Sequence, residues 1–183
     1  DDGNTVAIGA PGNDGNGNES GHVQIWREQN GVWTQLGDDI EGEAADDQSG
    51  SSVSISSDGN IVAIGAPGND GNGADAGHVR VYKIDNGSSW IQMGQDLDGE
   101  AAHDHSGHSV SLSNIGHGIA IGAPFNDGNG IQAGHVRVFE CFNENTWNQV
   151  GSDLDGKAAG VQSGWSVAIS RDGKTVAMTA QGV

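Results

Sequence analysis

The sequence predicts an all-β protein, a β-propeller built of four-stranded antiparallel blades of about 57 residues each. Three prolines, Pro11, Pro67 and Pro124, stand 56 and 57 residues apart, and His22, His78 and His135 repeat at the same steps. Each repeat holds several short apolar runs separated by Gly, Asn and Asp. A unit of this length cannot bury its own faces, so successive copies must pack against one another.

The copy at residues 51–107 shows the four strands in order. Residues 52–56 alternate polar and apolar side chains, which predicts a half-buried strand. The Asp58-Gly59 pair then predicts a hairpin turn. Residues 61–65 are apolar on both faces, so we expect this strand to be covered on both sides, and its small residues should let neighbouring sheets approach closely.

The second half of the copy continues the pattern. Pro67 removes an amide donor and ends the second strand, and a loop of Gly, Asn and Asp follows. Residues 78–82 alternate again, and a turn near Asn86 leads to a fourth strand at 90–94. Residues 95–106 then form an acidic connector to the next copy.

The same elements recur on either side of this copy. The third copy has them at 109–113, 119–122, 135–139 and 147–151; the first begins with its second strand, at 5–9, 22–26 and 33–37. The last residues supply two strands, 166–170 and 175–178. We therefore divide one propeller segment, 1–183, into an incomplete blade at 1–50, blades at 51–107 and 108–164, and the start of a further blade at 165–183. We expect a piece of a longer ring or array; a symmetric assembly of short arrays is the alternative.

Composition limits the partners. The chain has 25 acidic and 7 basic residues and a net charge of −18, which opposes binding to nucleic acid and to anionic lipid. No apolar stretch reaches the roughly 20 residues of a membrane-spanning helix. Cys141 is the only cysteine, and we expect a buried, inert thiol. Nearly every unusual residue recurs in each copy, whereas catalysis needs one singular constellation, so we predict that the protein is not an enzyme.

Two acidic segments of each repeat are candidate calcium sites, because calcium prefers six to eight oxygen ligands. The first is the loop after the Gly-Ala-Pro sequence, where Asn and Asp alternate with Gly. Its candidates are Asn13, Asp14, Asn16, Glu19, Asn69, Asp70, Asn72, Asp75, Asn126, Asp127 and Asn129. The alternative is an exposed turn whose Asn and Asp side chains bond their own backbone.

The second candidate is the connector, where carboxylates lie close together and repel one another unless a cation or solvent screens them. Its candidates are Asp39, Glu41, Glu43, Asp47, Asp96, Asp98, Glu100 and Asp104. The alternative is a solvated acidic rim.

The remaining recurring residues have simpler interpretations. His22, His78 and His135 each begin a strand after Gly, which favours a structural hydrogen bond over metal ligation. Trp33, Trp90 and Trp147 are interpreted as packing residues, with a platform for sugar rings as the alternative. Only one connector carries His103, Asp104, His105 and His108, which could bind Zn²⁺ or Cu²⁺ or simply form an exposed loop. Asn18 and Asn86 lie in weak glycosylation triplets.

The motif Ser49-Gly50-x-x-Val53, then Gly65-Ala66-Pro67, then Gly77-His78-Val79 resembles the FG-GAP repeat. The resemblance covers essentially the whole chain and implies the propeller of integrin α-subunits and of many secreted proteins. Ser49-Gly50 replaces the Phe-Gly dipeptide. The calcium loop of integrin-type repeats is reduced to Ser57-Asp58-Gly59-Asn60, so that site is not carried over.

The resemblance and the acidic composition together predict a non-enzymatic scaffold or adhesion protein, secreted or at the cell surface, that binds calcium. Its partner would be an extracellular protein or a glycan, without nucleic acid and without insertion into a membrane. Unpaired blade edges could also join copies of the chain. Two alternatives stay open: a lectin-like propeller, and a structural subunit of an extracellular filament or coat.

Overall fold

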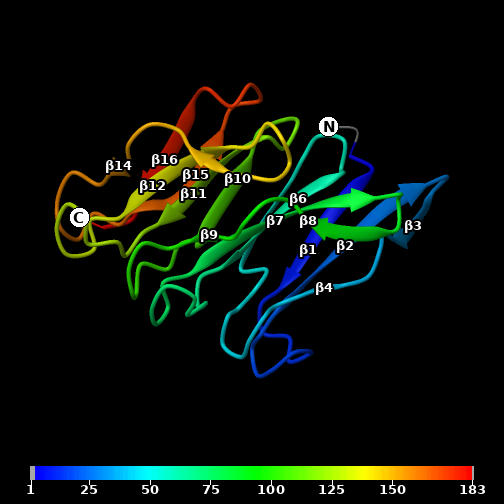
Figure 1. Cartoon of the computed structure of the whole chain (residues 1–183), viewed down its shortest axis with the longest axis horizontal. Helices are drawn as coiled ribbons and strands as arrows, with labels where there is room; N and C mark the ends of the chain where they lie inside the picture. Colours follow the sequence, from blue (N-terminus) through cyan, green and yellow to red (C-terminus); the bar gives the residue numbers. More distant parts are fainter. Residues whose placement is uncertain (1–2, 183) are drawn as a thin grey trace.

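The computed structural model describes residues 3–182 and contains four antiparallel sheets that follow one another along the chain (Figure 1). The first sheet contains β1 (Thr5–Ala10), β2 (His22–Gln29), β3 (Val32–Gln35) and β4 (Ile40–Glu41). The second contains β5 (Ser52–Ile55), β6 (Ile61–Ala66), β7 (His78–Asp85), β8 (Ser89–Gln92) and β9 (Leu97–Asp98). The third contains β10 (Ser109–Leu112), β11 (Gly118–Ala123), β12 (His135–Glu140), β13 (Asn148–Gln149) and β14 (Leu154–Asp155). The fourth contains β15 (Ser163–Ile169) and β16 (Val176–Ala180).

Each sheet is a propeller blade, as the periodicity predicts. Strand order within a blade follows the sequence, β5-β6-β7-β8 in the second and β10-β11-β12-β13 in the third. In the turn between β5 and β6, Asp58 accepts hydrogen bonds from the Ser56 hydroxyl at 2.6 Å and from the Asn60 backbone amide at 3.1 Å. This bonding holds the turn between β5 and β6 that the Asp-Gly pair predicts.

The fourth strand differs from its prediction, because it is split into two pieces. β8 pairs with the end of β7, and β9 pairs with the beginning of the same strand, His78 opposite Asp98. Gly94, at φ 77°, turns the chain out of the sheet between the two pieces. The predicted strand at 90–94 is therefore too long at its C-terminal end, and part of the predicted connector is a strand.

The buried hydrophobic residues form two core clusters, one between the first and second blades and one between the second and third. The first joins Val23 and Ile25 of β2 to Val62 and Ile64 of β6. The second joins the opposite face of the second blade, with Val79 and Val81, to β11 and β12 of the third. Because successive side chains point to opposite faces of a strand, β6 and β7 supply both clusters. This explains why the second strand of each repeat is apolar throughout.

Glycines bring adjacent blades into backbone contact. A Cβ atom added to Gly65 would lie 2.1 Å from the carbonyl oxygen of Gly107, and one added to Gly122 would lie 2.1 Å from that of Gly164. The hydroxyl of Ser52 donates to the same Gly107 oxygen at 2.7 Å. The glycine of the Gly-Ala-Pro sequence thus meets the Ser-Gly pair of the following blade, as the small residues predict.

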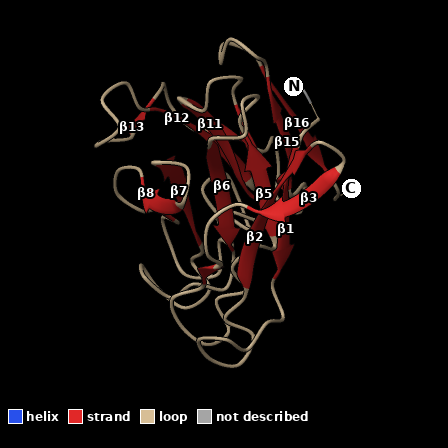
Figure 2. Cartoon of the chain, turned by 90° about the vertical axis from the view of Figure 1, so that its right-hand side faces the viewer, coloured by secondary structure: helices blue, strands red, loops and turns tan. Residues whose placement is uncertain are grey.

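The loops that follow the Gly-Ala-Pro sequences gather at one end of the sheets, together with the connectors (Figure 2). Parallel bridges join Gly77 to Ser106 and Gly134 to Ser163, so each loop lies against the connector of its own repeat. Among residues 3–182 no helix is long and apolar enough to cross a bilayer. The residue ranges proposed for the individual blades stay predictions.

Candidate functional site

The Asn/Asp-Gly loops are held by their own polar side chains. In the loop between β6 and β7, the side-chain oxygen of Asn69 accepts from the Gly71 amide at 2.8 Å, and Asp70 accepts from the Asp75 amide at 2.8 Å. Asn72 donates to the carbonyl of Gly99 at 2.8 Å. The other loops repeat these bonds through Asn13, Asp14, Asn16, Asn126, Asp127 and Asn129. These are the bonds of a self-supporting turn, and calcium binding by the loops stays a prediction.

Two acidic residues of the connectors form hydrogen bonds with the same loops. Asp47 and Asp104 are buried, 2% and 3% exposed. Asp104 accepts hydrogen bonds from the Ala101 amide at 3.0 Å and from the Asn126 side chain at 2.8 Å. Asp47 accepts from Asn69 and Ala44 in the equivalent way. These carboxylates therefore fix the connector of one blade to the loop of the next.

The other connector acids meet the repeated histidines. The described residues contain three His/Asp/Glu clusters whose ligand atoms lie within 4.8 Å of one another, so each cluster could hold a metal ion. The clusters are His22 with Asp39 and Glu41, His78 with Glu43 and Asp96, and His135 with Glu100 and Asp153. In the last two, the glutamate comes from the preceding blade. These two clusters lie across blade interfaces, whereas the cluster at His22 lies within the first blade.

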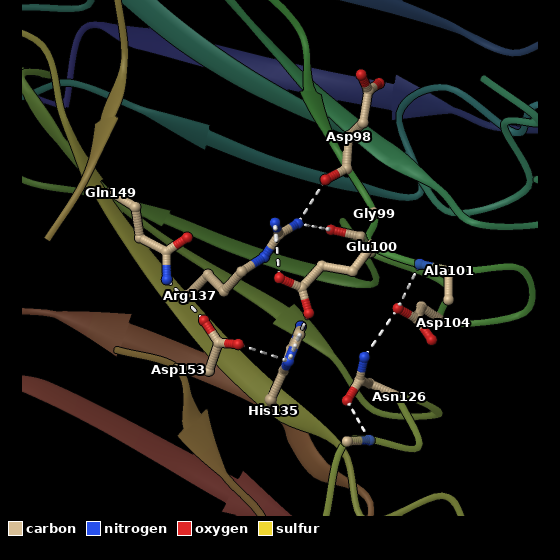
Figure 3. Close-up of polar contacts among 12 residues, drawn as sticks. Asp98, Gly99, Glu100, Ala101, Asp104, Asn126, His135, Arg137, Gln149 and Asp153 are labelled. Atoms are coloured by element: carbon tan, nitrogen blue, oxygen red, sulfur yellow. Dashed lines mark hydrogen bonds and ion pairs between the residues drawn. The ribbon is translucent and has the colours of Figure 1, made fainter. Parts of the chain in front are cut away.

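The cluster at His135 is shown in Figure 3. The Nδ1 atom of His135 lies 3.9 Å from Glu100 Oε2 and 4.0 Å from Asp153 Oδ2. The imidazole is 1% exposed, and its Nδ1 atom has no hydrogen-bond partner. Burial lowers the pKa of His135 below its ordinary value, and the positive charge of Arg137 lowers it further. The imidazole is thus neutral at neutral pH.

Arginines hold the preceding blade beside two of the clusters. Arg137 donates to the backbone carbonyl of Asp98 at 2.5 Å, and its Nη1 lies 3.8 Å from Glu100. Arg80 donates to the carbonyl of Glu41 at 2.9 Å. Its distance to the glutamate of the cluster, 3.2 Å to Glu43, is shorter than the distance from Arg137 to Glu100. At the first cluster Gln24 replaces the arginine and donates to both oxygens of Asp39.

Sequence reasoning found the acids and the histidines but did not bring them together. The pairing crosses a blade interface, and no spacing along the chain reveals it. One signal was available: Gln35, Gln92 and Gln149 each stand four residues before an aspartate. Each donates to Oδ1 of that aspartate, at 2.5–2.6 Å. In Asp39 and Asp153 the other oxygen, Oδ2, faces the histidine Nδ1 atom at 3.5 and 4.0 Å. The candidate Asp98 accepts the hydrogen bond from Arg137 through its backbone carbonyl and not through its carboxylate. Burial raises the pKa of its carboxyl group.

Two of the three repeated tryptophans lie between blades, as their packing interpretation predicts. Trp147 is 3% exposed, and its indole nitrogen donates to the carbonyl of Met93 in the preceding blade at 2.7 Å. Trp90 donates to Leu36 of its preceding blade at 2.7 Å. Trp33 is 48% exposed. Two of the three indoles are thus engaged within the fold. Cys141 is buried and free, as expected.

The singular histidine connector does not form a cluster of metal ligands among the described residues. His103 is exposed and lies 3.4 Å from Asp75, while Asp104 is committed to its structural bonds. His105 and His108 instead pack with Phe125 and Trp165, with ring centroids 4.5–6.5 Å apart. Burial lowers the pKa of His108. The result is an aromatic cluster, and within residues 3–182 no equivalent cluster forms in the other copies.

The two glycosylation candidates are exposed. Asn18 donates to Asp46 at 3.0 Å, and Asn86 donates to Asp85 at 2.9 Å. Both side chains lie at the surface, where an oligosaccharide has room. Their glycosylation stays a prediction.

Comparison with solved structures places the fold among larger proteins. The chain is similar to the Pseudomonas aeruginosa periplasmic gluconolactonase, with a TM-score of 0.58 and 15% identity over 98% of this chain and 47% of that one. It is also similar to a hypothetical selenium-binding protein from Sulfolobus tokodaii, with a TM-score of 0.54 and 11% identity over 84% of this chain and 38% of that one. The chain thus spans less than half the length of these proteins. At such identities the likeness shows the fold alone.

A search of curated proteins found no matching sequence. The sequence profile of the FG-GAP repeat matches residues 41–82 and 97–139. Each matched segment runs from the end of one blade through the first three strands of the next. It therefore contains the glutamate of one blade together with the histidine and arginine of its neighbour. The chain thus contains two repeats of the FG-GAP family, at residues 41–82 and 97–139.

Proposed function

We propose that this chain is a non-enzymatic scaffold or adhesion propeller, secreted or at the cell surface, that recognises an extracellular protein or a glycan. The observation that carries the proposal is the repetition of its polar chemistry. The bonds within the loops and the His/Asp/Glu clusters recur from blade to blade, and two of the three clusters, like the Asp104–Asn126 bond, join one blade to the next. Repeated contacts of this kind suit an extended recognition surface better than a single reaction centre.

The acidic surface and the strand edges support this role. A net charge of −18 keeps the surface soluble and attracts divalent cations. β1 is an edge strand that exposes Val6 and Ile8, and β16 exposes Met178. Edges of this kind allow copies to join head to tail, which also fits the alternative role in a filament or coat.

Calcium is the cation that we propose for the Asn/Asp-Gly loops. Adding calcium to chelator-treated protein should raise its melting temperature, by an amount that corresponds to about 2.7 kcal/mol at a hundredfold excess over Kd. Beads coated with the chain should also attach to cells in calcium and detach when a calcium-selective chelator is added. Differential scanning calorimetry and a bead-attachment assay measure the two effects.

The double variant Asp70→Asn and Asp127→Asn should weaken both effects markedly, because it removes a carboxylate from two of the three loops. Asp85→Asn, a matched change of one charge outside the loops, should keep them. An equal melting temperature with and without calcium would contradict the calcium assignment. Calcium-dependent stabilisation without attachment would contradict the adhesive role.

The aromatic cluster favours a second candidate, carbohydrate binding. Phe125 borders a depression that is also lined by His103, His105, Asp127 and Gln132, and Trp165 packs beside it. Aromatic rings beside carboxylate and amide groups provide the stacking and the hydrogen bonds that a sugar ring requires.

A glycan array tests this candidate. If the cluster binds sugars, the wild-type chain should give hits that disappear in Phe125→Gly and in Trp165→Ser. These changes install the residues found at the equivalent positions of the second copy, Gly68 and Ser51, so the blade should still fold. Phe142→Ser, which alters a phenylalanine that is 78% exposed outside the cluster, should keep the hits. An array without hits would remove the lectin alternative.

A further inference from the structure

The interface between the second and third blades contains a buried polar atom without a partner. The Nδ1 atom of His135 is enclosed by Glu100 of the preceding blade and by Asp153 of its own blade, yet it makes no hydrogen bond. An unsatisfied buried nitrogen is costly, and such groups are rare in folded proteins. This atom points toward two carboxylates that lie too far away to bond it directly (Figure 3).

The distances suit a bridging cation. Hydrogen bonds from nitrogen to oxygen end near 3.2 Å, whereas the two carboxylate oxygens lie 3.9 and 4.0 Å from the imidazole nitrogen. Ligands that each lie about 2.0–2.2 Å from a metal ion are separated from one another by roughly 3–4 Å. An ion placed among the three atoms would therefore reach each of them with small side-chain movements.

We propose that Glu100, His135 and Asp153 bind a divalent first-row transition metal ion of the Zn²⁺ class and so join two successive blades. The chemistry of the ligands selects the ion. Calcium and magnesium prefer oxygen ligands, whereas a neutral imidazole with carboxylates suits zinc and its neighbours. Three protein ligands leave a fourth position for water or for a group of a partner.

Neighbouring residues hold the ligands in place. Gln149 donates to Oδ1 of Asp153 at 2.6 Å and so leaves Oδ2 toward His135. Arg137 donates to the carbonyl of Asp98 and forms a long ion pair, 3.8 Å, with Oε1 of Glu100, which leaves Oε2 of the glutamate toward His135. With one arginine and two carboxylates, the surroundings keep a net negative charge that favours a cation.

The preceding interface carries a second, weaker copy of the site. Glu43, His78 and Asp96 occupy the equivalent positions, with Gln92 bonded to Asp96 at 2.6 Å. Here Arg80 lies 3.2 Å from Glu43 and competes with a metal ion for its carboxylate. The site at His135 should therefore bind first and more tightly. Both copies are separate from the Asn/Asp-Gly loops, so this proposal goes beyond the calcium binding and adhesion proposed above.

Titration of the metal-free chain tests the proposal. Zn²⁺, followed by isothermal titration calorimetry, should bind with a tighter site followed by a weaker one. Co²⁺ should give visible absorption bands typical of mixed nitrogen and oxygen ligands. Glu100→Gln and Asp153→Asn should each remove the tighter site, with circular dichroism unchanged, because both side chains are partly exposed, 44% and 28%. Gln149→Leu should weaken it by roughly 10–100-fold while keeping the cobalt spectrum, as expected of a positioning residue.

The control is His103→Asn, which removes an exposed imidazole outside the three His/Asp/Glu clusters and should leave zinc binding unchanged. The proposal is overturned if Zn²⁺ fails to bind the wild-type chain, if Glu100→Gln and Asp153→Asn bind as the wild type does, or if His103→Asn loses the tighter site. Failure of the zinc test leaves the calcium prediction intact, because that prediction is read from Asp70 and Asp127.

Discussion

Replacing Trp147 by alanine should destabilise the chain by about 3–5 kcal/mol, the range for removing a buried tryptophan. Its indole is 3% exposed and packs in the core cluster between the second and third blades. The substitution also leaves the carbonyl of Met93 without its donor. Denaturant unfolding followed by circular dichroism measures the change.

The repeat supplies a matched control for this variant. Trp33 occupies the equivalent position in the first copy but is 48% exposed, so Trp33→Ala should change stability by no more than about 0.5 kcal/mol. Trp147→Phe keeps most of the apolar contact and removes the hydrogen bond, so its loss should fall between the two. Equal losses in Trp147→Ala and Trp33→Ala would show that Trp147 does not join the blades.

Replacing Gly122 by alanine should cost about 1–3 kcal/mol or more, as overpacking does. The new methyl group would lie 2.1 Å from the carbonyl oxygen of Gly164 and 2.4 Å from the hydroxyl of Ser109. One of these contacts is backbone, so no rotation of a side chain relieves it, and the two blades must move apart. A fall in the thermal melting temperature measures the effect.

Gly12→Ala is the control for this substitution. A Cβ atom at Gly12 would meet nothing within 4 Å, and neither Gly12 nor Gly122 has the left-handed φ that favours glycine. Because alanine also reduces the freedom of the unfolded chain, Gly12→Ala should be neutral or slightly stabilising. A Gly122→Ala variant as stable as Gly12→Ala would contradict the close approach of the blades.

The long strands follow from local sequence because their signals are local. The alternation in residues 52–56 predicts β5, which is half-buried along its length, and the continuous apolar run predicts β6, which is buried beyond Ile61. The split outer strand was missed for the same reason. Strand β9 consists of only two residues, Leu97 and Asp98. It forms because the beginning of β7 offers backbone groups for pairing beside it. A strand that short has no period of its own to detect.

The candidate site was predictable in its parts and not in its arrangement. Glu100 was recognisable as a connector acid and His135 as a repeating histidine, whereas Asp153 was visible only through Asp96, its equivalent in the second copy. Their meeting depends on the third blade turning its histidine face toward the connector of the second. Similarly, the loop acids were visible as oxygen-rich, whereas the structure was needed to show Asp70 bonded to the Asp75 amide.

The amino-acid sequence by itself determined the repeat, the strands and the choice of small residues such as Gly65, because propensity, turn chemistry and period act over a few neighbouring residues. Tertiary structure decided which residues 35 or more positions apart share a site, as Glu100 and His135 do. The physical reason is that packing one sheet on the next creates contacts whose partners have no fixed spacing along the chain. A periodic sequence can therefore specify the strands of each blade, whereas the sites that residues of two blades form together exist only once the blades pack against one another.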